Sequence, residues 1–166
     1  IVYGIGAFSL AKDIGVSNRE AKRYIESYLA HYSGVDSYMK NVVERAKADG
    51  YVETMFGRRR NLPELTSGKH MIRAFGERVA RNMPIQGTAA DIIKIAMIKV
   101  DERMKAENLR ARLVLQVHDE LIVEAPQDES MRVALIVQEE MENAVKMSVP
   151  LTADAAVGRT WYDAKG

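Results

Sequence analysis

The segment Leu113-Val-Leu-Gln-Val-His-Asp-Glu-Leu-Ile-Val-Glu124 decides how this chain folds. Valine, leucine and isoleucine on both sides of His118-Asp119 predict two strands that are apolar enough to be buried, and Ala125-Pro126 ends the second strand. Two strands joined by so short a link form an antiparallel hairpin. Such a turn normally takes Asn-Gly or Asp-Gly, because these pairs tolerate positive φ. Turn geometry therefore does not account for the His-Asp pair.

The tip of this hairpin carries charge. His118, Asp119 and Glu120 place an imidazole and two adjacent carboxylates at one end of the strands. Like charges so close repel each other unless a cation neutralises them, and carboxylate oxygens favour Mg²⁺ or Mn²⁺ over zinc. An Asp in a turn more commonly accepts hydrogen bonds from nearby amides, and a His there is more commonly solvated. The segment alone leaves both interpretations open, a metal site and an ordinary polar turn.

The composition is that of an ordinary globular domain, with 166 residues of which 47% are hydrophobic and 28% charged. No apolar run reaches the roughly 18 to 20 residues that span a bilayer, and no signal peptide opens the chain, so we expect no membrane partner and a cytoplasmic location. The chain has no cysteine, which excludes disulfides and thiolate metal sites. Because the first residue is Ile1 rather than Met, we expect the chain to start inside a larger protein.

Charge is segregated along the chain. From Arg58 to Arg81 there are seven basic and two acidic residues, a balance of +5, whereas from Asp119 to the end there are four basic and ten acidic residues, a balance of −6. This division suits a protein that grips a polyanion with one part and holds cations with another. Solvated helix faces without any partner would produce the same pattern.

Two helices are predicted in the first fifty residues. Residues 17–20, Ser-Asn-Arg-Glu, fit a capping box and predict a helix to about His31, which Gly34 ends. Apolar residues at helical spacing from Val35 to Ala46 predict a second helix that stops at Gly50.

A second hairpin and a boundary follow. Tyr51-Val-Glu-Thr-Met55 and Arg58-Arg-Arg-Asn-Leu62 flank Phe56-Gly57, which predicts a short hairpin ended by Pro63. The small polar run Thr66-Ser67-Gly68 is the most suitable internal boundary.

Helical spacing from Lys69 to about Asn108 predicts a long helix, interrupted and bent at Pro84. Two rows of side chains step by four along it. The apolar row is predicted to be core and consists of Met71, Phe75, Val79 and Met83. The polar row needs another explanation and consists of Arg78, Asn82 and Gln86. A second apolar stripe, also predicted to be core, consists of Ile93, Ala96, Met97, Val100 and Met104.

After the central hairpin the pattern predicts an amphipathic helix from Gln127 to about Met147 and a closing strand from Leu151 to Val157. The predicted order is therefore helices first and then strand, strand, helix, strand. We expect an α+β fold in which an antiparallel sheet packs on long helices.

These motifs resemble family A DNA polymerases, of the bacterial DNA polymerase I type. The resemblance rests on Gln116-Val-His-Asp-Glu120, on Arg78-Val-Ala-Arg-Asn-Met-Pro-Ile-Gln-Gly-Thr-Ala-Ala-Asp91 and on Tyr3-Gly4, in the order that the family has them. It extends over essentially the whole chain and includes Gly50-Tyr-Val-Glu-Thr54 and Gly57-Arg-Arg-Arg60. Val-His-Asp-Glu alone would be a weak signal, whereas the ordered set is specific.

The resemblance implies a role for each candidate residue. Asp119 matches the catalytic aspartate that ligates Mg²⁺, with Mn²⁺ as a possible substitute, and Glu120 matches the accessory carboxylate beside it. The remaining matches line the primer-template DNA or its insertion site, and they are Tyr3, Arg78, Asn82, Gln86 and His118. The implied activity is template-directed transfer of a nucleotide from a dNTP to the primer 3′-hydroxyl by a two-metal mechanism.

The resemblance also implies an organisation. Residues 1–67 match part of the fingers subdomain and residues 68–166 the C-terminal half of the palm, in a cytoplasmic, nucleoid-associated enzyme of replication and repair, from a bacterial or phage-infected cell. The family's first catalytic aspartate and its dNTP-binding helix precede the matched region, and so do the thumb and the first half of the palm. We therefore expect the isolated chain to be inactive and the remainder of the polymerase to be its partner.

Two other functions remain open from the sequence. One is a non-catalytic nucleic-acid-binding module that keeps the palm fold. The other is a different metal-dependent phosphoryl-transfer enzyme, such as a nuclease, with a coincidental hairpin.

Overall fold

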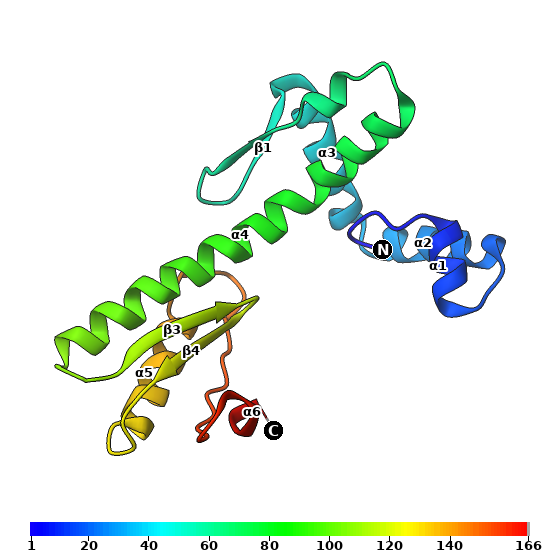
Figure 1. Cartoon of the computed structure of the whole chain (residues 1–166). Helices are drawn as coiled ribbons and strands as arrows, with labels where there is room; N and C mark the ends of the chain where they lie inside the picture. The colour runs from blue at the N-terminus through cyan, green and yellow to red at the C-terminus, as the bar shows by residue number, and fades with distance from the viewer. Residues whose placement is uncertain (166) are drawn as a thin grey trace. The chain divides into compact units, whose positions relative to one another are not determined.

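The computed structural model describes residues 1–165 and divides into two compact units, Ile1–Thr88 and Ala89–Gly166 (Figure 1). The long helix α4, His70–Ala106, contributes residues to both units. Helices accompany two separate two-stranded antiparallel sheets, so the α+β prediction is confirmed. Among the helices described, none is both long and apolar enough to cross a membrane.

The first unit begins with three helices, α1 (Ala7–Ile14), α2 (Asn18–His31) and α3 (Ser33–Asp49). The predicted capping box is confirmed, because Ser17 Oγ accepts from the Glu20 amide at 3.2 Å while the Ser17 amide donates to Glu20 Oε2 at 3.1 Å. Gly50 ends α3 as predicted, with a left-handed φ of 79°.

The predicted break at Gly34 is wrong, since Gly34 lies inside α3 and the chain turns at Tyr32 instead. The Tyr32 amide donates to Tyr28 O and closes α2, while the Tyr32 carbonyl accepts from Val35 and Asp36 and opens α3. One residue thus serves both helix ends, and a glycine in the following first turn is tolerated because few intrahelical bonds depend on it.

The second hairpin is present but shorter than predicted, with β1 (Tyr51–Glu53) and β2 (Arg59–Asn61) paired antiparallel. A 3₁₀ turn, η1 (Pro63–Thr66), follows it and was not predicted. The first core joins α3, the hairpin, η1 and α4, and its buried members are Val43, Ala46, Val52, Leu62, Leu65 and Ala80.

Helix α4 is continuous through Pro84, so the predicted interruption is wrong. Only half of its first apolar row is core: Val79 and Met83 pack against the first core, but Met71 and Phe75 are 84% and 44% exposed. Leu65 of η1 contacts the helix at Gly76, about one turn beyond Met71. Met71 and Phe75 come before this contact, so η1 does not cover them.

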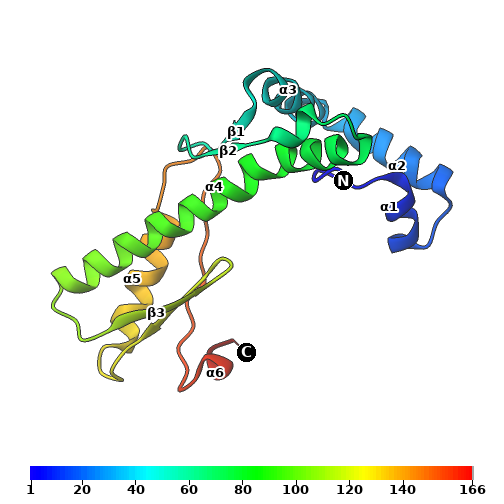
Figure 2. The ribbon, with the colours of Figure 1, turned by 45° about the horizontal axis from the view of Figure 1, so that its top comes forward.

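The second unit packs one face of the central hairpin on two helices (Figure 2). Its strands are β3 (Arg112–Val117) and β4 (Glu120–Glu124), and the second helix is α5 (Ser130–Glu142). The core residues from α4 and α5 are Val100, Met104, Val133 and Ile136, and the hairpin adds Leu113, Leu121 and Val123. Val114 and Leu115 remain about half exposed beside an irregularity in the register, so the strands are covered on one face rather than buried.

The closing strand predicted from Leu151 to Val157 is absent, and the segment has no regular structure. An extended segment needs a partner strand for its amides and carbonyls, and within residues 1–165 each sheet contains only its own two strands. The Ala153 amide donates to Glu142 Oε1 at 3.2 Å and ties this segment to the end of α5. A short helix, α6 (Trp161–Lys165), follows and was not predicted.

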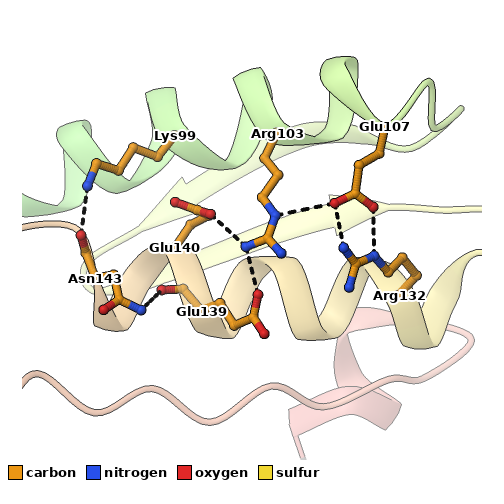
Figure 3. Close-up of polar contacts among 7 residues, drawn as sticks. All are labelled: Lys99, Arg103, Glu107, Arg132, Glu139, Glu140 and Asn143. Atoms are coloured by element: carbon orange, nitrogen blue, oxygen red, sulfur yellow. Dashed lines mark hydrogen bonds and ion pairs between the residues drawn. The ribbon is translucent and has the colours of Figure 1, made fainter.

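An ionic network joins α4 to α5 (Figure 3). Arg103 Nη1 contacts Glu139 and Glu140 at 2.7 Å each, and Arg103 Nε contacts Glu107 at 3.3 Å. Arg132 of α5 holds Glu107 from the other side, with Nε at 2.6 Å. Since β3 begins soon after Glu107 and β4 leads into α5, this network supports the base of the central hairpin.

We expect the network to make the stability of the second unit depend on pH in the acid range. Hydrogen bonds from Arg132 and then Arg103 hold the pKa of Glu107 below its ordinary value of 4.5. A carboxylate whose pKa is lower in the folded than in the unfolded state stabilises the fold when the pH is above its ordinary pKa. This stabilisation is lost as the pH falls through the pKa of the folded state. We expect the free energy of unfolding, measured by urea denaturation, to fall below about pH 4.5, and we expect Glu107→Gln to remove part of that fall.

Glu102→Gln is the matched control, because Glu102 is exposed on the same helix and is not in the network. An unchanged pH profile in Glu107→Gln would contradict a stabilising role for the network.

Candidate nucleic-acid and metal site

The central hairpin turns through two residues, His118 and Asp119, as predicted, with Val117 paired to Glu120. His118 has a φ of 52°, a left-handed value that is uncommon for a residue with a side chain. Gln116 Nε2 donates to the His118 carbonyl at 2.5 Å and fastens the turn. Left-handed backbone at residues other than glycine clusters at functional sites, so the conformation of His118 supports a functional role for this turn.

The two carboxylates at the turn differ in their partners. Glu120 Oε1 lies 3.3 Å from Lys165 Nζ of α6, and their side chains are 41% and 64% exposed. Asp119 is exposed and has no hydrogen bond or ion pair with any residue that the structure describes. The repulsion expected from the sequence is thus reduced at Glu120 by an internal cation, while Asp119 keeps both oxygens available.

These donors fit part of a site for Mg²⁺. Magnesium binds through one or two carboxylates and completes its octahedron with water and substrate phosphates. Asp119 and Glu120 supply such carboxylates, but residues 1–165 contain no group of three or more acidic, His or Cys residues that could hold a metal. The turn therefore offers a partial coordination sphere of hard oxygen ligands.

The polar row Arg78, Asn82 and Gln86 lies on α4 within the first unit. Arg78 and Gln86 are exposed, and Arg78 has no ion pair in the described part of the chain. Asn82 Oδ1 is buried and lacks a hydrogen-bond donor among the described residues. A buried acceptor without a donor is costly, so the Asn82 amide is the unsatisfied polar group of this row.

The neighbouring cations have protein partners, which distinguishes Arg78 from them. Arg81 and Lys47 contact Glu77 at 3.6 Å and 3.0 Å, and the hydrogen bond from Lys47 lowers the pKa of Glu77. Arg59 contacts Glu53 at 3.2 Å and lies 4.3 Å from the centre of the Tyr51 ring. Much of the positive charge noted in the sequence is therefore engaged within the unit.

Tyr3 and Gly4 lie beside the start of the polar row. A Cβ at Gly4 would stand 4.0 Å from Arg78 Cγ and 3.7 Å from Arg81 Nη1, so the chain end passes close to this face of α4. The Gly4 φ of 81° suits glycine. Tyr3 is 51% exposed and free to contact a ligand.

The structure thus groups the predicted residues in two sets. Tyr3, Arg78, Asn82 and Gln86 belong to the first unit. In the second unit His118 and Asp119 form the turn, and Glu120 begins β4. Sequence reasoning missed Lys165, because a lysine near the end of a chain belongs to no motif. It also missed the two buried threonines, Thr54 and Thr88, although Thr54 beside a hairpin turn and Thr88 one turn after Pro84 are hydrogen-bonding positions.

Comparison with known proteins gives one consistent family. The family model described as DNA polymerase family A matches residues 1–163. The DNA polymerase I of Bacillus caldotenax is 53% identical over 165 residues, and that of Bacillus subtilis is 51% identical over 165 residues. In both comparisons the match covers 99% of this chain and 19% of the relative, so the chain spans about a fifth of the length of these relatives.

Solved structures agree with this result. A POL domain of Pol1 from M. smegmatis, in complex with DNA primer-template and dNTP, has a TM-score of 0.94 and 45% sequence identity. The match covers 99% of this chain and 29% of that one.

Proposed function

The chain belongs to DNA polymerase family A, and on that premise we propose that it forms part of an enzyme of template-directed DNA synthesis. The reaction is transfer of a nucleotide from a dNTP to a primer 3′-hydroxyl. The observation that carries the proposal is Asp119, an exposed carboxylate without a protein partner among the described residues, on a fastened two-residue turn. The sequence resemblance matches this residue to the family's catalytic aspartate.

Asp119 and Glu120 are the residues that would hold Mg²⁺, or Mn²⁺ in its place. A pair of divalent ions, when bound, supplies electrostatic stabilisation to the attacking and leaving oxygens of the displacement. The part played by this chain is to present the Asp119 oxygens in a fixed direction, which the Gln116 hydrogen bond supports. Glu120 serves as an accessory ligand whose charge Lys165 partly offsets.

The polar row on α4 would read the shape of the primer-template. Every Watson–Crick pair offers an acceptor in the minor groove, either purine N3 or pyrimidine O2. Donors from Arg78 and Gln86 can therefore check the pair without selecting a base, as copying requires. Asn82, Tyr3 and His118 complete the contacts that the family resemblance assigns to DNA near the insertion site.

The proposal extends to the whole enzyme. Residues 1–67 belong to the fingers and residues 68–166 to the palm, and the remainder of the polymerase supplies the thumb, the first half of the palm, the dNTP-binding helix and the second catalytic aspartate. The partners are primer-template DNA and dNTPs, the molecules present in the solved M. smegmatis complex. We place the enzyme in replication and repair, in the cytoplasm and with the nucleoid.

Loss of Asp119 tests the metal assignment. In a chimera that carries these residues in place of the matching segment of a bacterial DNA polymerase I, we expect Asp119→Ala to lower primer extension about 10³-fold or more, because it removes a group that acts on developing charge. Duplex binding, measured by fluorescence anisotropy, should be largely unchanged. Asp154→Ala is the matched control, since Asp154 is an exposed aspartate of the same unit. Ordinary turnover in Asp119→Ala would refute the assignment.

Loss of Gln86 tests the minor-groove contact. We expect Gln86→Ala in the same chimera to lower kcat/KM for extension about tenfold, and to reduce discrimination against mismatched primer ends, because loss of one hydrogen bond costs roughly 0.5 to 1.5 kcal/mol and about 1.4 kcal/mol is tenfold. Steady-state extension from matched and mismatched primers measures both effects. Gln127→Ala, at an exposed glutamine outside the row, serves as the control. Equal fidelity in the two variants would rule out the contact.

The isolated chain tests the division of labour. We expect the 166 residues alone to give no metal-dependent primer extension, because Asp119 and Glu120 make an incomplete coordination sphere and fewer charges hold the ion weakly. A gel assay with labelled primer-template and Mg²⁺ measures this, with the chimera as positive control. Extension by the isolated chain would show that the site is complete without the rest of the enzyme.

A further inference from the structure

Two threonines of the first unit are buried although their side chains are polar. Thr54 and Thr88 are 4% and 6% exposed, and they are the buried polar residues of the described chain. Thr54 is the last residue before the tip of the β1–β2 hairpin, and Thr88 lies in α4 one turn after Pro84. Both belong to the first unit. Because a buried hydroxyl is costly unless it is paired, each must have partners.

Thr88 joins the hairpin tip to the helix. Its hydroxyl donates to the Pro84 carbonyl, and the same oxygen accepts from the Met55 amide at 3.1 Å. Thr54 organises the tip itself, because its hydroxyl accepts from the amides of Phe56 and Arg58 at 3.3 Å and 3.2 Å. The bond from Thr88 to Pro84 is buried, and the bonds from the amides at the hairpin tip are partly buried.

Two further contacts bring the same surfaces together at Gly87. Arg58 Nη2 donates to the Gly87 carbonyl at 2.9 Å. A Cβ at Gly87 would stand 2.7 Å from Thr54 Cγ2, closer than two carbon atoms can approach. The hairpin tip therefore packs directly on the helix backbone, and glycine is required at 87 for this approach.

The helix needs support at this turn. Pro84 has no amide hydrogen, so α4 lacks one backbone hydrogen bond in the turn that precedes Gln86. Gln86 is exposed and lies between Pro84 and Thr88, next to Gly87. We propose that Thr88 and Thr54 are positioning residues for Gln86: their hydroxyls hold the hairpin tip against the turn of α4 from Pro84 to Thr88, which follows the weakened turn, and thereby fix the direction of the Gln86 side chain. This inference rests on the proposed contact between Gln86 and the primer-template.

A double-mutant cycle in the chimera tests the inference. Thr88→Val keeps the shape of the side chain but removes the hydroxyl, so we expect discrimination against mismatched primer ends to fall about fivefold to tenfold, the range for loss of a buried hydrogen-bonding group. If Thr88 acts through Gln86, Thr88→Val causes no further loss of discrimination when added to Gln86→Ala. Thr88→Ser keeps the hydroxyl and should retain most of the discrimination.

Gly87→Ala provides an independent test of the inference if the Thr88→Val variant does not fold. The new Cβ would collide with Thr54 Cγ2, so we expect Gly87→Ala to lower discrimination and Thr54→Ser, which removes that methyl group, to restore it. Thermal unfolding of each variant separates loss of folding from loss of positioning.

The outcomes distinguish the two levels of the proposal. Suppose that Gln86→Ala lowers discrimination. The positioning role is then refuted if Thr88→Val has its full effect when added to Gln86→Ala. It is also refuted if Thr54→Ser fails to restore the discrimination lost in Gly87→Ala. In both cases the function of Gln86 stands. If Gln86→Ala has no effect, the contact of Gln86 with DNA is refuted and the positioning role with it. Non-additive loss together with rescue supports the inference.

Discussion

The packing of one hairpin face on two helices is the constraint on which the second unit depends. Leu113, Leu121 and Val123 pack against the buried side chains of α4 and α5. Because side chains alternate between the two faces of a strand, a slip of the register by one residue would move each of them to the opposite face. Fixed register leaves only His118 and Asp119 for the turn. A candidate metal ligand at the tip is therefore positioned by apolar packing some distance away, and the Arg103 network strengthens the same helix pair.

A comparable arrangement supports the polar row of the first unit. Apolar packing around Leu62 and Ala80 joins α3, the β1–β2 hairpin and the first part of α4. The hairpin tip reaches the helix through buried hydroxyl groups close to Gln86. Arg78 and Gln86 in the first unit and Asp119 in the second, all proposed to act on DNA or metal, are exposed, while neighbours with no direct role restrict their movement. Such preorganisation reduces the entropy that must be lost when a ligand binds.

Sequence patterns predicted the features that depend on local chemistry. The capping box at Ser17, the stop at Gly50 and the two-residue turn at His118 follow from side-chain hydrogen bonds and strand alternation within a few residues. The predictions were wrong where contacts between residues far apart in the sequence determine the local structure. The segment from Leu151 to Val157 has strand composition but no partner strand among the described residues. Met71 is exposed because the described elements cover its apolar row only farther along the helix, at Val79 and Met83. Lys165 reaches Glu120 from more than forty residues away, which no local pattern reveals.

The central claim is that Asp119 is a metal ligand of a DNA polymerase, and a crystal structure of the chimera with primer-template, dNTP and Mn²⁺ tests it most directly. Anomalous scattering identifies Mn²⁺ without reference to the protein. The account predicts an anomalous peak at bonding distance, about 2.0 to 2.2 Å, from an Asp119 carboxylate oxygen. A fully occupied Mn²⁺ site that Asp119 does not touch, with the dNTP in place, would contradict the account.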